Sequence, residues 1–220
     1  MSTDETCSSN HTQPRRSSTN APAVIPARSA PTVGSSLTTP VHRAYLSLID
    51  RTGHPRFDIS PLWNNPSALN ELISDIVAYF PIADFDRIVA LDALGFILGG
   101  ALAIRTGRPL VTVRKGGKLP LDFTRKVAVT FMDHDGEKTM EVRRDLVPPE
   151  ARLLLVDEWI GTGAQVKHVA AMLKELECVV VGVATVYCFP DHDGAMEIAR
   201  TFKLFAANCL VCTYFECRCN

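Results

Sequence analysis

The chain has 220 residues, of which 46% are hydrophobic and 21% charged, and its formal net charge is −1. These values are typical of globular proteins that bury a sizeable core, and they give no electrostatic footprint of bulk nucleic-acid or membrane binding. No apolar run reaches the ~20 residues of a membrane-spanning helix, and the N-terminus lacks a signal-peptide stretch. We therefore expect neither nucleic acid nor membrane as a partner.

The first 40 residues differ in composition from the rest. They are rich in Ser, Thr and Pro and contain no aromatic residue. Such a segment cannot bury enough apolar surface to offset the chain entropy lost on folding, so residues 1–40 are predicted to be a disordered tail. Several arginines among the serines would suit a mitochondrial transit peptide, but Asp4, Glu5 and the lack of an amphipathic pattern argue against one.

Beyond the tail, strand and helix patterns alternate. Asn65 and Pro66 suit the start of a helix, and apolar residues at helical spacing follow until Pro81. A hairpin is predicted around the turn 133–136. The predicted helices cover residues 66–80, 94–104 and 163–176; the predicted strands cover 87–92, 110–114, 127–130, 139–142, 153–157, 179–186 and 202–206. This alternation predicts an α/β fold, with a parallel sheet flanked by helices on both faces.

The domain is predicted over residues 41–207, and residues 208–220 form an atypical tail that follows no period. Four of the seven cysteines fall there, at Cys209, Cys212, Cys217 and Cys219. They could be read as a zinc site, but structural zinc sites usually separate two ligand pairs by a loop, which has no room here. We favour incidental or surface thiols and a reducing compartment, which predicts a cytoplasmic location.

The most specific pattern is an apolar strand that ends in Asp157 and Glu158 and leads through a short Gly/Thr loop into a helix. Ligands of open parallel sheets bind beyond the carboxyl ends of the strands. The unpaired amides of a helix start suit a phosphate, and the acids can accept hydrogen bonds from sugar hydroxyls. The predicted phosphate-binding residues are Gly161, Thr162, Gly163, Ala164 and Gln165.

A second candidate segment, residues 114–120, follows another predicted strand. Its basic residues Arg114, Lys115 and Lys118 surround a Gly-Gly pair. The segment could be a solvated turn, but its spacing and its position after a strand favour anion binding.

In their order along the chain, these motifs resemble those of the type I phosphoribosyltransferases, and among them the adenine phosphoribosyltransferases. The resemblance spans about residues 57–187 and is carried by residues 58–67, 91–96, 114–120 and 157–163. It implies transfer of 5-phosphoribosyl from phosphoribosyl pyrophosphate to a purine base, expected to be adenine, giving AMP and pyrophosphate in purine salvage. It also implies Mg²⁺ and a homodimer.

The resemblance also assigns roles to residues. Asp157 and Glu158 would hold the ribose hydroxyls, with Mg²⁺ carried by the donor near them, and residues 161–165 would hold the 5′-phosphate. Arg114, Lys115 and Lys118 would face the pyrophosphate or the mobile loop. Magnesium and basic groups would offset the charge that gathers on the leaving group.

Several positions depart from the family pattern. Leu94 stands where the family has an arginine that helps to bind pyrophosphate, and His134 stands where it has the catalytic Glu of the hairpin. His134 can act as an acid or base, and a neighbouring aspartate might take the carboxylate's place; a solvated turn is the alternative. Glu158 replaces an Asp, Gln165 replaces a Thr, and Phe57 replaces an Arg.

These departures leave three functional hypotheses. The leading hypothesis is an active transferase that uses adenine. The second is a regulatory protein that binds phosphoribosyl pyrophosphate or a nucleotide but has weakened chemistry, and the third is a transferase for another or a modified base.

Overall fold

The structure is a computed structural model that describes residues 43–53, 57–189 and 192–208. The predicted tail at residues 1–40 and the four clustered cysteines lie outside the described residues.

A seven-stranded sheet forms the centre of the domain, with strand order β3-β4-β2-β1-β5-β6-β7. The strands β2, β1, β5, β6 and β7 run parallel, whereas β4 pairs antiparallel with β2 and with β3. The strands are β1 Arg87–Leu91, β2 Leu110–Lys115, β3 Lys126–Asp133, β4 Gly136–Arg143, β5 Arg152–Ile160, β6 Val179–Cys188 and β7 Leu204–Ala206.

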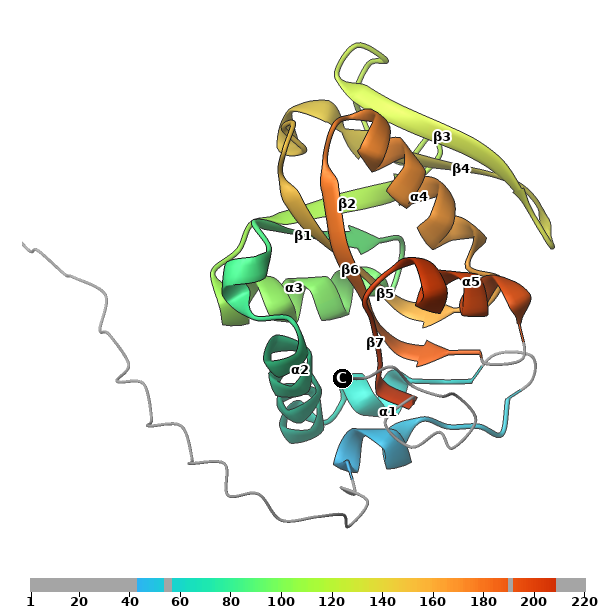
Figure 1. The fold of residues 1–220 in the computed structure, drawn as a ribbon. Coiled ribbons are helices and arrows are strands. Elements are labelled where there is room, and N and C mark those ends of the chain that lie inside the picture. The colour runs from blue at the N-terminus through green and yellow to red at the C-terminus, as the bar shows by residue number, and fades with distance from the viewer. Residues whose placement is uncertain (1–42, 54–56, 190–191, 209–220) are drawn as a thin grey trace, which may run out of the picture. The chain divides into compact units, whose positions relative to one another are not determined.

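Helices cover both faces of this sheet (Figure 1). They are α1 Ser60–Trp63, α2 Pro66–Tyr79, α3 Gly95–Thr106, α4 Ala164–Glu175 and α5 Asp193–Thr201, with short 3-10 turns at Ala44–Leu48, Ile82–Asp84 and Arg144–Leu146. As predicted, Asn65 caps α2 by accepting a hydrogen bond from the Ala68 amide. Gly107 ends α3 in the left-handed conformation at φ 67°.

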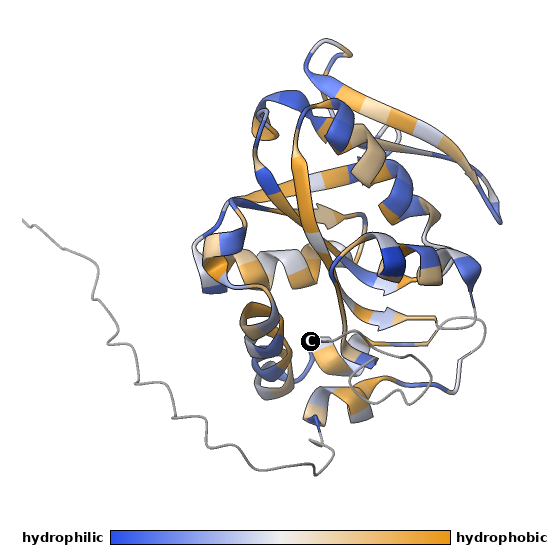
Figure 2. Cartoon of the chain, in the orientation of Figure 1, coloured by the Kyte–Doolittle hydropathy of each residue, from blue (hydrophilic) through white to orange (hydrophobic). Residues whose placement is uncertain are grey.

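Two apolar clusters, one on each face, make the core. Alternate residues of β5 point to opposite faces, so that Leu153 and Leu155 pack with α4 and α5, whereas Leu154 and Val156 pack with α2 and α3. Figure 2 shows hydrophobic residues along the central strands and hydrophilic residues on the outer parts of α2 and α4. Because both faces are buried, the central strands read as continuous apolar runs.

The predicted α/β fold is confirmed, and three details differ from prediction. The sheet is mixed rather than parallel throughout, because the predicted hairpin adds β4 and β3 antiparallel to its edge. Strand β5 continues past the acids to Ile160, because Trp159 and Ile160 pair with Tyr187 and Cys188 of β6. The short helix α1 and helix α5 were not predicted.

Within the part of the chain that the structure describes, no helix combines the length and the apolar character needed to cross a membrane.

Candidate functional site

The parallel strands bring the predicted site segments together at the end of the sheet that is formed by the carboxyl ends of these strands. Asp92 follows β1, the basic segment 114–120 begins in the last two residues of β2, and the loop 161–163 follows β5. These three strands are neighbours in the order β2-β1-β5. The carboxyl ends of parallel strands face the same side, which is where ligands bind in open α/β sheets.

Residues 161–163, named the phosphate loop after their predicted ligand, lead from β5 into α4. Gly163 has φ 75°, a left-handed conformation that favours glycine, and it immediately precedes the first residue of the helix. The Thr162 hydroxyl oxygen accepts a hydrogen bond from the Ala164 amide at 3.3 Å. The amides of the first helical turn have no partner within the helix, so the start of α4 is suited to an anion.

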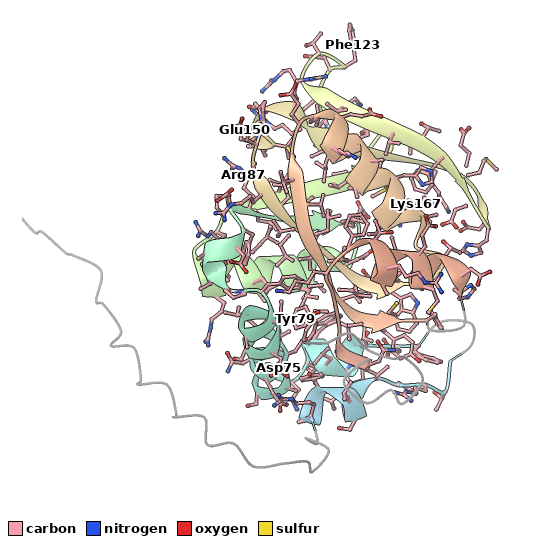
Figure 3. The ribbon with its side chains drawn as sticks, viewed as in Figure 1. Asp75, Tyr79, Arg87, Phe123, Glu150 and Lys167 are labelled. Atoms are coloured by element: carbon pink, nitrogen blue, oxygen red, sulfur yellow. The ribbon has the colours of Figure 1, made fainter. Side chains whose placement is uncertain are left out.

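Helix α5 supports this loop from outside. A Cβ atom added to Gly163 would lie 2.7 Å from the Gly194 carbonyl oxygen, and one added to Gly194 would overlap the Thr162 carbonyl group. The Lys167 ammonium and the Glu197 carboxylate, 2.6 Å apart, join α4 to α5, and Figure 3 shows Lys167 on α4. The two glycines therefore permit a backbone approach that no larger residue would allow.

The two acids lie within β5 rather than at its end. Asp157 is buried, with 5% of its surface exposed, and its carboxylate accepts hydrogen bonds from the Glu158 amide at 2.9 Å and from Gln165 Nε2 at 3.2 Å. Burial and the adjacent Glu158 carboxylate raise the pKa of Asp157 well above its usual range. Gln165, at the end of the phosphate-loop motif, thus contacts the first acid directly.

The second acid has unused hydrogen-bonding capacity. Glu158 Oε2 is buried, and no described residue donates a hydrogen bond to it. Buried polar atoms are normally satisfied, so this oxygen can accept a hydrogen bond from water, from a ligand or from the neighbouring Asp157 carboxyl group when that group is protonated. Two adjacent carboxylates, one with an unsatisfied oxygen, suit sugar hydroxyls or a hard divalent cation.

The start of α3 approaches the acids closely. A Cβ atom added to Gly95 would lie 2.9 Å from the Val156 carbonyl oxygen and 3.3 Å from Asp157 Oδ1. Leu94, the residue before it, is 40% exposed and lies at the N-cap of this helix. A larger residue at position 95 would therefore displace the first acid, whereas position 94 is open to solvent.

The basic segment is held by contacts with the hairpin. Glu141 of β4 is buried; Lys126 Nζ lies 2.6 Å from its Oε1, and the Leu119 amide donates to its Oε2 at 3.4 Å. Burial alone would raise the pKa of Glu141, but the hydrogen bonds from Lys126 and from the segment's amides outweigh it and lower the pKa. Lys115 and Lys118 are exposed. Among the described residues, no hydrogen bond or ion pair joins this segment to the phosphate loop.

Arg114 forms an ion pair with Asp92 at the carboxyl end of the parallel strands. Its Nε donates to Asp92 Oδ2 at 3.0 Å, and its guanidinium lies 5.7 Å from the centre of the Phe96 ring. Asp92 therefore orients Arg114 beside the start of α3.

The hairpin tip contacts the phosphate loop. Thr162 Oγ1 donates to Asp133 Oδ1 at 2.9 Å, although the two residues are 29 positions apart. His134, 63% exposed in its side chain, places Nδ1 3.1 Å from the same Asp133 oxygen. Asp133, His134 and Asp135 offer three possible metal-ligand atoms within 4.8 Å of one another, an arrangement that is common in exposed acidic turns, and we base no site on it.

An aromatic cluster at the carboxyl ends of β5 and β6 was not predicted from the sequence. Trp159 and Tyr187 stack with their ring centres 4.8 Å apart, and Phe57 packs edge-on against both. Phe189 completes the cluster. The available signal was the aromatic content just after the predicted strand ends, but only the pairing of β5 with β6 brings the rings together. Trp159 is two residues from Asp157, so the cluster adjoins the acids.

Comparisons with known proteins agree with the geometry of the site. No family model matches the chain. Adenine phosphoribosyltransferase from Rhizobium johnstonii is 33% identical over 141 residues, which are 64% of this chain and 77% of the relative. The enzyme of the same name from Pseudomonas aeruginosa is 33% identical over 153 residues, 68% of this chain and 82% of the relative.

Solved structures agree with these relatives. The crystal structure of adenine phosphoribosyltransferase from Rhodothermus marinus superposes with a TM-score of 0.67 at 26% identity, covering 74% of this chain and 94% of that one. The Saccharomyces cerevisiae enzyme, solved with D-2,5-dideoxy-2,5-imino-altritol 1,6-bisphosphate and adenine, gives 0.64 at 25% identity, with coverage of 73% and 94%. With the strand, acid pair, loop and helix in place, these likenesses show that the chain belongs to the adenine phosphoribosyltransferase family.

Proposed function

We propose that the protein transfers the 5-phosphoribosyl group of phosphoribosyl pyrophosphate to adenine and so forms AMP and pyrophosphate in purine salvage. A ring nitrogen of the base forms a bond to C1 of the ribose while the bond from C1 to the pyrophosphate oxygen breaks, and the electron pair leaves with pyrophosphate. The proton that this nitrogen carries in the free base is released to solvent. The observation that carries the proposal is the acid pair of β5, of which Asp157 is buried, beside the amide-rich start of α4.

The donor is held at two points. The amides of residues 161–165 and the Thr162 hydroxyl receive the 5′-phosphate, which the positive end of α4 favours. Asp157 and Glu158 accept hydrogen bonds from the ribose hydroxyls, which supports the sugar at the point where positive charge develops. The unsatisfied Glu158 oxygen supports this assignment.

The acid pair also fits the Mg²⁺ that the family resemblance implies. Mg²⁺ prefers oxygen ligands and commonly binds one or two carboxylates together with substrate phosphates. Asp157 and Glu158 are the residues that would hold it, directly or through the ribose of the donor. When bound, the ion would neutralise negative charge on the pyrophosphate leaving group.

The leaving group and the base occupy opposite flanks of the ribose in this proposal. Lys115 and Lys118 are exposed cations at the end of β2, and with Arg114 they are the groups that can face the pyrophosphate. On the other flank, the part-exposed rings of Trp159 and Phe57 offer apolar faces on which a purine can stack. His134, which stands in place of the family's hairpin Glu, remains a candidate acid or base because it lies exposed at the tip.

The family resemblance further implies a homodimer. Cys178, a buried cysteine whose thiol is free, fits a reducing compartment and supports a cytosolic location.

A second candidate function is a regulatory protein that binds the donor without efficient chemistry. The observation that favours it is the exposed Leu94 at the start of α3, because leucine cannot donate a hydrogen bond to pyrophosphate.

The donor site is tested by changing Asp157→Asn and Glu158→Gln together and titrating phosphoribosyl pyrophosphate with Mg²⁺ in a calorimeter. We expect the affinity to fall by roughly a hundredfold, since two carboxyl hydrogen-bond acceptors are lost at about 0.5–3 kcal/mol each and such losses rarely add in full. The matched control is Asp84→Asn with Glu175→Gln, two exposed acids at the opposite end of the parallel strands. Unchanged affinity in the first double variant would exclude this donor site.

A further inference from the structure

The tip of the β3–β4 hairpin is docked on the phosphate-loop side of the sheet. Phe131 of β3 stacks on His168 of α4, with ring centres 4.4 Å apart and planes 3° from parallel. His168 Nδ1 lies 2.8 Å from the Ala164 carbonyl oxygen at the start of the same helix. These contacts fix the end of β3 over the first turn of α4, so the tip residues lie at the mouth of the phosphate loop.

Asp133, the last residue of β3, projects a carboxylate into that mouth. Its side chain is 15% exposed, and its Oδ1 accepts hydrogen bonds from Thr162 Oγ1 at 2.9 Å and from the His134 amide at 2.8 Å. Burial alone would raise the pKa of Asp133, but the hydrogen bonds from His134 and Thr162 outweigh it and hold the pKa below its usual range. The group is therefore negatively charged at neutral pH.

The Thr162 hydroxyl has a single proton to donate. In this structure that proton is directed at Asp133, while the hydroxyl oxygen accepts from the Ala164 amide. A phosphate oxygen that accepts a hydrogen bond from the Thr162 hydroxyl must therefore replace Asp133 as its acceptor. The phosphate and the carboxylate also repel each other, because both are negative.

We propose that Asp133 is a positioning residue that holds the Thr162 hydroxyl and the hairpin tip, and that the 5′-phosphate of the donor must displace it. The inference rests on the proposed function, because it requires the phosphate to bind at residues 161–165. Asp133 thereby weakens the binding of every ligand with a phosphomonoester at this loop. Donor binding and release of the hairpin tip are coupled through one hydroxyl group.

The probe is ribose 5-phosphate, which carries the phosphate and the ribose but neither pyrophosphate nor base. We expect Asp133→Ala to bind it roughly three- to tenfold more tightly than the unchanged protein, the range that corresponds to the net contribution of one hydrogen bond. Asp133→Asn, which keeps an acceptor but loses the charge, should give a smaller gain and serves if the alanine variant folds poorly. The measurement is titration calorimetry at fixed pH and ionic strength.

Asp135→Ala is the matched control. It removes the same charge two residues away, but Asp135 pairs with Lys138 at 2.7 Å and is 44% exposed in its side chain. The affinity of the Asp135→Ala variant for ribose 5-phosphate should stay within about twofold of that of the unchanged protein, since exposed ion pairs contribute little. Thr162→Val should bind ribose 5-phosphate more weakly, and adding Asp133→Ala to it should restore less affinity than Asp133→Ala gains alone.

Hydrogen exchange supplies a readout that affinity alone does not. In the unchanged protein, ribose 5-phosphate should speed exchange at the amides of residues 133–136, whereas in Asp133→Ala exchange there should be fast before ligand is added. If the unchanged protein binds ribose 5-phosphate and Asp133→Ala binds it equally or more weakly, the inference is overturned and the phosphate site stands. An equal gain in Asp135→Ala would overturn it too, by assigning the effect to net charge. If the unchanged protein and all variants fail to bind, the phosphate site fails and the inference with it.

Discussion

At the scale of single residues, the surroundings of Asp157 disfavour the ionised form of its carboxyl group. It is buried, it neighbours a second carboxylate, and its pKa is raised well above its usual range by that burial and by Glu158. The folded state therefore binds this proton more readily than the unfolded state does. The carboxyl group lowers stability as the pH rises from the unfolded pKa of about 3.9 toward the folded pKa, and the whole loss is present above the folded pKa.

The change Asp157→Asn should for this reason stabilise the folded protein at neutral pH. The amide has the shape of the protonated acid, and Gln165 can turn its own amide to match it. The midpoint of thermal unfolding should rise at pH 7, by roughly 2–4 °C for each kcal/mol gained in a domain of this size. The gain should vanish near pH 3, where both proteins are uncharged at this position. An equal or lower midpoint at pH 7, with Glu175→Gln as the exposed control, would show that the acid is not destabilising.

Leu94 and His134 are the two positions at which the chain lacks groups that the family pattern carries. Both side chains are exposed, at 40% and 63%, so replacing them should not disturb the core. Leu94→Arg with His134→Glu should raise the rate of AMP formation at least tenfold. Removal of one such donor typically lowers a rate by about a hundred- to a thousandfold, and paired losses need not add. A flat rate in the double variant, together with brisk turnover by the unchanged protein, would mean that the departures are harmless.

At the scale of elements, the phosphate loop is shaped by a helix that contributes no predicted ligand. The short helix α5 packs against the loop through Gly194, and the ion pair between Lys167 and Glu197 fixes α5 to α4. The loop conformation thus depends on a contact between segments about 30 residues apart.

Gly194→Ala tests that contact. Its Cβ would overlap the Thr162 carbonyl group, so the loop or α5 must move. We expect a loss of about 1–3 kcal/mol in the free energy of unfolding, typical of overpacking, and weaker binding of ribose 5-phosphate. The control is Gly100→Ala in α3, where an added Cβ meets nothing within 4 Å and should be neutral or stabilise the helix. Equal stability and affinity in both variants would argue against support of the loop by α5.

At the scale of the whole molecule, strong periodicity made most of the fold predictable. The buried strands β1, β5 and β6 appear as apolar runs, β2 was predicted from its β-branched residues, and α2 is bounded by Asn65 and Pro81. Helix α5 was missed because it has only nine residues, of which two, Ala195 and Ile198, are buried. The extension of β5 to Ile160 depends on pairing with β6, which the local sequence does not encode.

The candidate site was predictable only as far as its local motifs. The acid pair and the loop stand together in the sequence, whereas the contact of Asp133 with Thr162 and the aromatic cluster depend on how distant segments pack. Even the buried state of Asp157 is a product of the approach of α3 at Gly95. Local patterns thus predicted the candidate ligand-binding segments, and packing determined which of their atoms are available.

The most direct test of the whole account is to incubate the purified protein with phosphoribosyl pyrophosphate, Mg²⁺ and adenine and to quantify AMP and pyrophosphate. We predict that the two products form in equal amounts, that neither forms without adenine, and that Asp157→Asn with Glu158→Gln abolishes both. Donor binding without nucleotide formation from adenine or any other nucleobase would contradict the enzyme assignment and favour a regulatory binding protein.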